Sequence, residues 1–272
     1  METGSLEYTK FLVETILKER NDINLFNLLA GCYTPNVALY RYVLGLLRTS
    51  LDDTKFSVEL GKIARHFLLF HHDSDVKVLQ GKLRVLCGYG YDFYNCLEIM
   101  RITPLPLRIL EAFFNEGLGY LFNNTIALES YGIHASLGGR YELIFLLKNI
   151  EYSQNKIDRT IDDLIQASIQ MDERYLGTFL EVLLEVHPQY SLRDPLGLLR
   201  GTFEGSNLLL ASLLTSGLID LVQDRDEVWG AYAEKFVYDK GAVAHQKGVL
   251  IQHLGPVSQE SHTGRMLKAL GV

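Results

Sequence analysis

The chain has 272 residues, of which 47% are hydrophobic, and a formal net charge of −7 at pH 7. This length and apolar content suffice for a sizeable core, built either as one large domain or as a short array of repeats. The acidic balance excludes the basic surface that nucleic-acid-binding proteins carry. Contact with an anionic membrane would need a bridging cation or a local basic patch.

The cysteines and the N-terminus bear on the cellular compartment. Cys32, Cys87 and Cys96 are an odd number and form no C-x-x-C pair, which favours reduced thiols over a disulfide framework. Residues 1–7 contain no basic segment followed by an apolar one, so no signal peptide is expected. The longest apolar-rich run, 208–222, is too short and too polar to span a bilayer. These features predict a cytoplasmic protein that is not transmembrane.

Apolar residues recur at helical spacing along the whole chain. The spacing predicts helices over 8–20 and 25–30, and a third opened by Thr34-Pro35 as N-cap and first helical residue. The helices expected after these are one after Gly61, 76–86, 93–100, one capped by Thr103, one after Gly139, 161–169, one capped by Asp172, one after Gly205, 228–238, 249–254 and one after Gly264. Because no useful length alternates with period two, we predict an all-α fold.

Two signals recur along these helices. Three helix starts, Thr34, Thr103 and Asp172, are equally spaced in the chain, at an interval of about 70 residues. A short turn with Ser or Thr and a glycine precedes four helices, at Gly61, Gly139, Gly205 and Gly264. Recurrence at a fixed period is the mark of repeats, so we predict four repeats of about 70 residues, each of four to five short helices, in one curved helical core. Their boundaries are 1–72, 73–149, 150–215 and 216–272, with the fourth repeat shortened.

Four such units, each closing with a helix led by Ser/Thr-Gly, resemble the core of the annexin family. The segments 136–147 and 260–270 carry this closing pattern most clearly, and the erosion of the other motifs is similar to the annexin-like α-giardins. The resemblance implies a non-enzymatic protein at the periphery of acidic phospholipid membranes or the cytoskeleton, binding the phospholipid or a cytoskeletal protein. It also implies weak or lost calcium dependence.

Within this resemblance one calcium site is predicted, at Gly88, Gly90 and Glu129. The run Gly88-Tyr89-Gly90-Tyr91-Asp92 is similar to the Gly-x-Gly-Thr-Asp loop of annexins, whose carbonyls bind the ion with an acidic side chain farther along the chain. Glycines let a loop turn its carbonyl oxygens toward a hard cation. The alternative is that this run is a tight turn between helices. The position where annexins place an acid before the helix glycine is non-acidic in all four repeats: Val58, Ser136, Thr202 and Ser261.

The remaining candidate sites are a histidine cluster and catalytic motifs. His66, His71, His72, Asp73 and Asp75 could include metal ligands, but a solvated helix end explains them better, since His66 and His71 are not at i, i+4 spacing. No nucleophile elbow, P-loop or zinc-protease motif is present, so an enzyme is not expected. The alternative function is an ankyrin- or HEAT-like scaffold for protein–protein interaction, whose repeats would be shorter, at about 33 residues for ankyrin and about 40 residues for HEAT.

Overall fold

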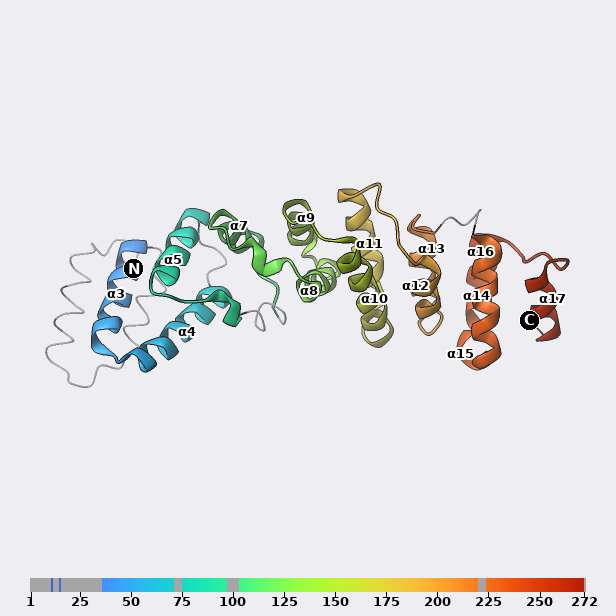
Figure 1. The fold of residues 1–272 in the computed structure, drawn as a ribbon, viewed down its shortest axis with the longest axis horizontal. Helices are drawn as coiled ribbons and strands as arrows, with labels where there is room; N and C mark the ends of the chain where they lie inside the picture. Colours follow the sequence, from blue (N-terminus) through green and yellow to red (C-terminus); the bar gives the residue numbers. More distant parts are fainter. Residues whose placement is uncertain are drawn as a thin grey trace. The chain divides into compact units, whose positions relative to one another are not determined.

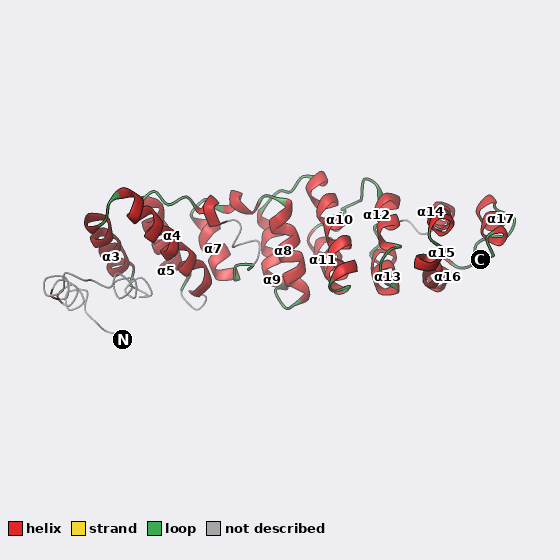
Figure 2. Cartoon of the chain, turned by 90° about the horizontal axis from the view of Figure 1, so that it is seen from below, coloured by secondary structure: helices red, strands yellow, loops and turns green. Residues whose placement is uncertain are grey.

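The computed structural model describes residues 36–70, 75–96, 103–219 and 224–271, together with residues 11 and 15. Within these ranges every regular element is a helix and no strand occurs (Figures 1 and 2). The predicted all-α fold is therefore confirmed. The chain divides into two compact units, Met1–Leu121 and Phe122–Val272.

The first unit is organised around α5. Its described helices are α3 (Val37–Ser50), α4 (Asp53–Phe70), α5 (Val76–Gly88), the 3-10 helix η2 (Phe93–Cys96) and α7 (Leu107–Asn115), followed by η3 (Gly119–Phe122) at the boundary. Helix α5 packs against both α3 and α7. Leu83 and Leu86 of α5, Leu47 of α3 and Phe113 of α7 are all buried. Their burial removes apolar surface from water and holds the three helices together.

The second unit consists of successive helix pairs. Its helices are α8 (Thr125–Ser136), α9 (Arg140–Asn149), α10 (Gln154–Gln170), α11 (Arg174–Val186), α12 (Pro195–Thr202), α13 (Asn207–Thr215), α14 (Arg225–Tyr238), α15 (Lys240–Val243), the 3-10 helix η4 (Ala244–Gln246), α16 (Lys247–Leu254) and α17 (His262–Ala269). Short turns join α8 to α9, α10 to α11 and α12 to α13, as in helical hairpins.

These pairs form two rows of helices. In the first row α8, α10, α12 and α14 contact one another in sequence, and α14 also contacts α17. In the second row α9, α11, α13 and α16 do the same. The second-row helices begin at Arg140, Arg174, Asn207 and Lys247, so the step is about 33 residues twice and then about 40 residues. Each pair therefore contacts mainly the pairs before and after it, as in a repeat array.

Polar contacts between pairs have the same step. The Lys156 ammonium donates to the carbonyl and side-chain oxygens of Asn123, at 2.9 and 2.8 Å, across 33 positions of the chain. Arg200 pairs with Glu234, 34 positions later, at 3.2 Å. The buried Tyr152 hydroxyl donates to a carbonyl 30 positions earlier at 3.0 Å. The Arg200–Glu234 contact links α12 to α14, and the other two link the start of α10 and the residues before it to the segment that leads into α8.

The recurrence of the three helix starts now has a structural basis. Helices α3, α7 and α11 begin at Val37, Leu107 and Arg174, so their starts are also about 70 residues apart. This interval is close to twice the step between the starts of α9, α11 and α13. The recurrence in the sequence therefore spans two helix pairs. The annexin-like grouping into four repeats, with the boundaries given above, remains a prediction.

One of the predicted caps is wrong and one is confirmed. Glu173 is the N-cap residue of α11 and its side chain makes no cap bond; the Asp172 side chain, one position earlier, accepts the backbone N–H of Arg174 at 2.9 Å and so caps the start of this helix. Thr103 does not cap α7, which begins at Leu107 after Pro106 with no side-chain cap. Pro104 and Pro106 each disfavour helical geometry in the residue before them, so a helix cannot run from Thr103 through Leu105, and α7 starts after the extended Pro106 at its N-cap. Thr34 lies outside the described residues.

The predicted glycine-led helix starts are correct at Gly139 and Gly205, whereas at the C-terminal turn the helix starts before the glycine, because Gly264 lies inside α17 (His262–Ala269). Gly139 and Ser206 are the N-caps of α9 and α13, and Ser261 is the N-cap of α17. Gly61, however, lies inside α4, and the helix starts earlier, where Asp52 accepts the N–H of Lys55 at 2.8 Å. A single glycine costs a helix only about 1 kcal/mol, which packing readily offsets. The expected turn before Gly61 is therefore absent.

The glycine near the C-terminus has a steric role. Ser261 accepts the N–H of Gly264 at 2.9 Å and donates to the Ser258 carbonyl at 2.7 Å, which folds residues 258–261 tightly against α17. A Cβ added at Gly264 would lie 1.9 Å from the Ser258 carbonyl oxygen. Since that neighbour is backbone, the turn itself would have to move.

Replacing Gly264 by alanine should destabilise the protein by about 1–3 kcal/mol, because the added methyl group overpacks this turn. Gly230, in the middle of α14, is the matched control, since a Cβ there meets nothing within 4 Å. Gly230→Ala should raise stability by about 0.5–1 kcal/mol through the helix preference of alanine. Urea denaturation of both variants measures the difference. Equal midpoints would refute the steric role of Gly264.

Candidate functional site

The predicted calcium-binding residues belong to different units. Gly88 is the last residue of α5 and Gly90 follows it in the first unit, whereas Glu129 lies on α8 in the second. Gly90 has φ +82°, a conformation that favours glycine. The N–H of Gly90 donates to the Cys87 carbonyl at 2.8 Å, and that of Tyr91 donates to the Leu86 carbonyl at 3.1 Å. This is the hydrogen-bond pattern of a Schellman helix end.

The run from Gly88 to Tyr91 is thus a helix-terminating turn, the alternative that the sequence left open. Both glycines are exposed. The calcium site at Gly88, Gly90 and Glu129 remains a prediction. Among the residues that the structure describes, no group of three or more His, Cys, Asp or Glu side chains could hold a metal ion.

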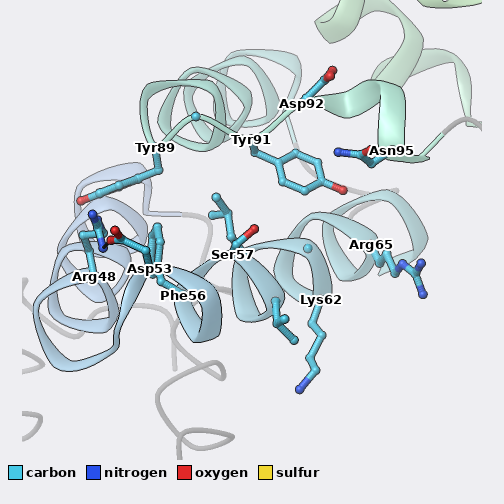
Figure 3. A pocket seen from close by; sticks show the side chains of 14 residues that line it. Arg48, Asp53, Phe56, Ser57, Lys62, Arg65, Tyr89, Tyr91, Asp92 and Asn95 are labelled. Carbon is cyan, nitrogen blue, oxygen red and sulfur yellow. Dashed lines mark ion pairs between the residues drawn. The ribbon is translucent and has the colours of Figure 1, made fainter.

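The same turn forms one wall of a groove of about 710 Å³, here called the α4–α5 groove (Figure 3). Its other wall is the N-terminal half of α4. The lining residues are Arg48, Asp53, Phe56, Ser57, Val58, Leu60, Gly61, Lys62, Arg65, Tyr89, Gly90, Tyr91, Asp92 and Asn95. Figure 3 shows the Tyr91 ring between the turn and α4, with the Lys62 side chain directed away from the groove.

Aromatic and charged contacts fix one end of the groove. Arg48 pairs with Asp53 at 2.6 Å, and its guanidinium lies 5.2 Å from the centre of the Phe56 ring. Phe56 in turn meets Tyr89 edge-on, with ring centroids 5.7 Å apart. Because cation–π and edge-to-face contacts are directional, they hold the turn in place against α4.

The other end of the groove offers unused hydrogen-bonding groups. Within the described residues the side chains of Arg65 and Asn95 make no hydrogen bond or ion pair. Ser57 and Asp92 add a hydroxyl and a carboxylate to the lining. Among the described residues that line the groove there is no histidine or cysteine, so none of them offers Ser57 an imidazole as a general base. Such a lining suits binding of a polar chain segment better than covalent chemistry.

The sequence pattern pointed to Gly88 and Gly90 but missed Ser57, Arg65 and Asn95. Ser57 and Arg65 come from α4, which only the tertiary fold brings next to the turn, whereas Asn95 lies in η2, directly after the turn in the chain. No sequence motif identifies these residues, because what they share is their place around the groove and not a regular spacing in the chain.

The structure also describes the surroundings of two candidate reactive side chains, Cys87 and His66. The pKa of the Cys87 thiol is raised, mainly by its burial and further by the charge of Glu116, so the reactive thiolate is disfavoured. The pKa of His66 is lowered by burial and by the nearby charge of Lys82. His71, His72 and Asp73 of the predicted metal cluster lie outside the described residues.

A second, smaller cavity of about 560 Å³ lies in the second unit, between the start of α10 and the segment after α11. Gln154 donates to Asp158 at 3.1 Å and to the Tyr190 hydroxyl at 3.2 Å, and Tyr190 donates to Asp158. Burial, and then the bond to Asp158, raise the pKa of Tyr190. Because these groups satisfy one another, this cavity is better explained as a polar joint within the α10–α11 pair than as a binding site.

Comparison of the chain with protein-family models, with curated proteins and with solved structures finds no match. Among the described helices, none has both the length and the apolar character that a membrane span requires.

Replacing Gly90 by alanine should destabilise the first unit by about 1–2 kcal/mol, because a side chain in the left-handed region meets its own backbone. Gly88→Ala is the matched control, since Gly88 is helical and a Cβ there meets nothing within 4 Å. Chemical denaturation of the two variants gives the comparison. A loss of stability at Gly88 as large as that at Gly90 would contradict the assigned turn.

Proposed function

We propose that the chain is a non-enzymatic helical-repeat scaffold that binds a protein partner. The observation that supports this proposal is the step of about 33 residues between α9, α11 and α13, which is near the period of ankyrin-type arrays. Polar contacts between helix pairs have the same step. Arrays of this kind present extended surfaces made from successive repeats, which suit protein partners.

The α4–α5 groove supports the same proposal. Its Arg65 and Asn95 side chains, which have no partner among the described residues, and its aromatic wall at Tyr89 and Tyr91 can bind a peptide segment. Aromatic and arginine side chains supply most of the binding energy at protein interfaces.

The scaffold proposal predicts that the full chain, immobilised and panned against a random peptide display library, enriches families of related peptides. Their binding should be saturable. It should also be unchanged in the Glu129→Gln variant, because Glu129 is part of the predicted calcium site and not of the scaffold proposal. The absence of any enriched family would count against a protein-binding scaffold.

A second candidate is peripheral binding to acidic phospholipid or the cytoskeleton, as the annexin resemblance implies. The observation that favours it is that Gly88 and Gly90 are both exposed on a turn. Gly90 has a left-handed backbone conformation, which lets a loop direct carbonyl oxygens toward a cation.

Co-sedimentation with phosphatidylserine vesicles separates the two candidates. Under the scaffold proposal the chain stays in the supernatant, both without calcium and at about 1 mM calcium, the range of weak extracellular-type sites. Calcium-dependent pelleting that is lost in Glu129→Gln would instead support the membrane candidate and its predicted site.

A further inference from the structure

The second unit exposes large apolar side chains along one edge. We call this the turn edge: the ends of α8, α10, α12 and α14 with the turns or first residues that follow them. The exposed residues there are Leu137 (64%), Tyr141 (72%), Met171 (73%), Leu208 (54%), Val237 (54%) and Tyr238 (87%). Elsewhere in the described part of this unit, only Ile126 and Ile251 are large, apolar and exposed.

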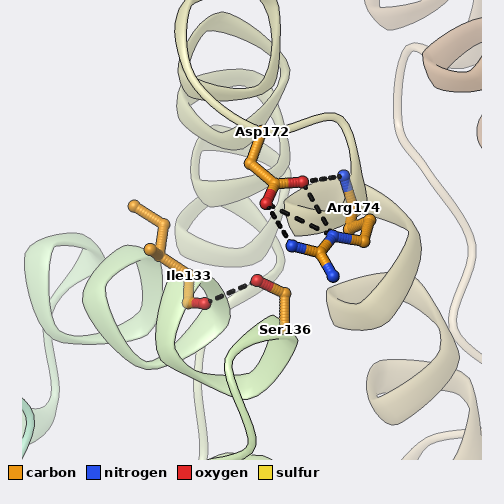
Figure 4. A network of polar contacts seen from close by, with 4 residues as sticks. All are labelled: Ile133, Ser136, Asp172 and Arg174. Atoms are coloured by element: carbon orange, nitrogen blue, oxygen red, sulfur yellow. Dashed lines mark hydrogen bonds and ion pairs between the residues drawn. The ribbon is translucent and has the colours of Figure 1, made fainter.

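Successive turns lie side by side along this edge. Helix α8 contacts both α10 and α11, and Figure 4 shows Ser136, at the end of α8, beside the Asp172–Arg174 pair of the next turn. Farther along, Glu204 in the turn after α12 pairs with Lys235 near the end of α14. Exposed apolar residues that recur on adjacent turns mark an interaction surface, because single ones are scattered on ordinary surfaces.

The charge around the first two turns is negative. Arg140 is neutralised by Glu185 at 2.7 Å and Glu181 at 3.2 Å, and Arg174 by Asp172 at 2.7 Å. Glu173, next to Met171, has no ion pair within the described residues. Near Leu137, Arg140 is thus matched by two carboxylates of α11, and beside Met171 the carboxylates of Asp172 and Glu173 outnumber the single guanidinium of Arg174.

The net charge of the whole second unit is also negative. Residues 122–272 contain 19 acidic and 13 basic residues, so this unit carries −6 of the net −7. A second copy would bring a like charge to the edge, which opposes association. A cationic partner would instead be attracted and steered toward it.

We propose that the turn edge binds a lysine- or arginine-rich amphipathic segment of a partner protein. Its apolar side chains pack on Leu137, Tyr141 and Met171, and its cations face Glu173 and the neighbouring carboxylates. This inference rests on the proposed scaffold function and names the chemistry of the partner.

The probe is a synthetic amphipathic peptide of about five helical turns, with leucine and lysine at helical spacing, titrated into the full chain by fluorescence anisotropy. The double variant Leu137→Ser/Met171→Ser should bind about tenfold more weakly, the scale expected when interface anchors are truncated. Both residues are exposed, so circular dichroism and the urea midpoint should stay unchanged. Ile126→Ser, at the opposite end of α8, is the matched control and should bind like the unaltered chain.

Three further measurements test the proposal. Glu173→Gln should weaken binding, and added salt should weaken it further, since the attraction is electrostatic. Equal affinity for the double variant and the Ile126→Ser control would overturn the proposal, and so would equal binding of a peptide with glutamate in place of lysine. A dimer in sedimentation equilibrium that the double variant abolishes would also overturn it, because a second copy would then occupy the edge.

The panning experiment separates this inference from the scaffold function. Peptide families that are enriched but are not basic, or that bind the double variant equally, would refute the turn edge alone. Enrichment of no family would refute the scaffold as well.

Discussion

The structure of the second unit depends on burial that no helix pair can achieve alone. Helix α10 buries Ile157, Ile161, Leu164 and Ile165, and it contacts α8 on one side, α12 on the other, and α11 in the second row. An isolated pair would leave much of this apolar surface in water, and the unfavourable hydration would exceed its small net stability. Stacking on both neighbours is therefore the condition under which these short helices are stable.

This mode of packing also determines what surface is left for function. Each pair uses two sides for its neighbours, so the ends of the helices and the turns remain for ligands. In the second unit these turns carry apolar side chains among carboxylates. In the first unit, the left-handed Gly90 ends α5 and turns the chain back over α4, which forms the α4–α5 groove. In both units, the candidate binding residues therefore lie where helices end and turns begin.

The sequence predicted the helical class correctly, because apolar spacing records which face each helix buries. It also contained the step of the array, since the interval between Thr103 and Asp172 spans two helix pairs. The predicted helix starts at Gly61 and Thr103 were wrong. Gly61 lies inside α4 and does not precede a helix, and α7 begins after Pro106 and not at Thr103. The groove and the turn edge could not be predicted, because their residues become neighbours only through contacts between helices.

Zero-length carbodiimide crosslinking, read by mass spectrometry, tests the central claim that each helix pair stacks on the next. Lys235 on α14 pairs with Glu204 in the turn after α12, 31 positions earlier. Nearest-neighbour stacking predicts a Lys235–Glu204 crosslink that disappears in Glu204→Gln, while the Lys62–Glu59 crosslink within α4 persists as the internal control. Crosslinking of Lys235 only to carboxylates of pairs that are not its neighbours would contradict the stacked arrangement.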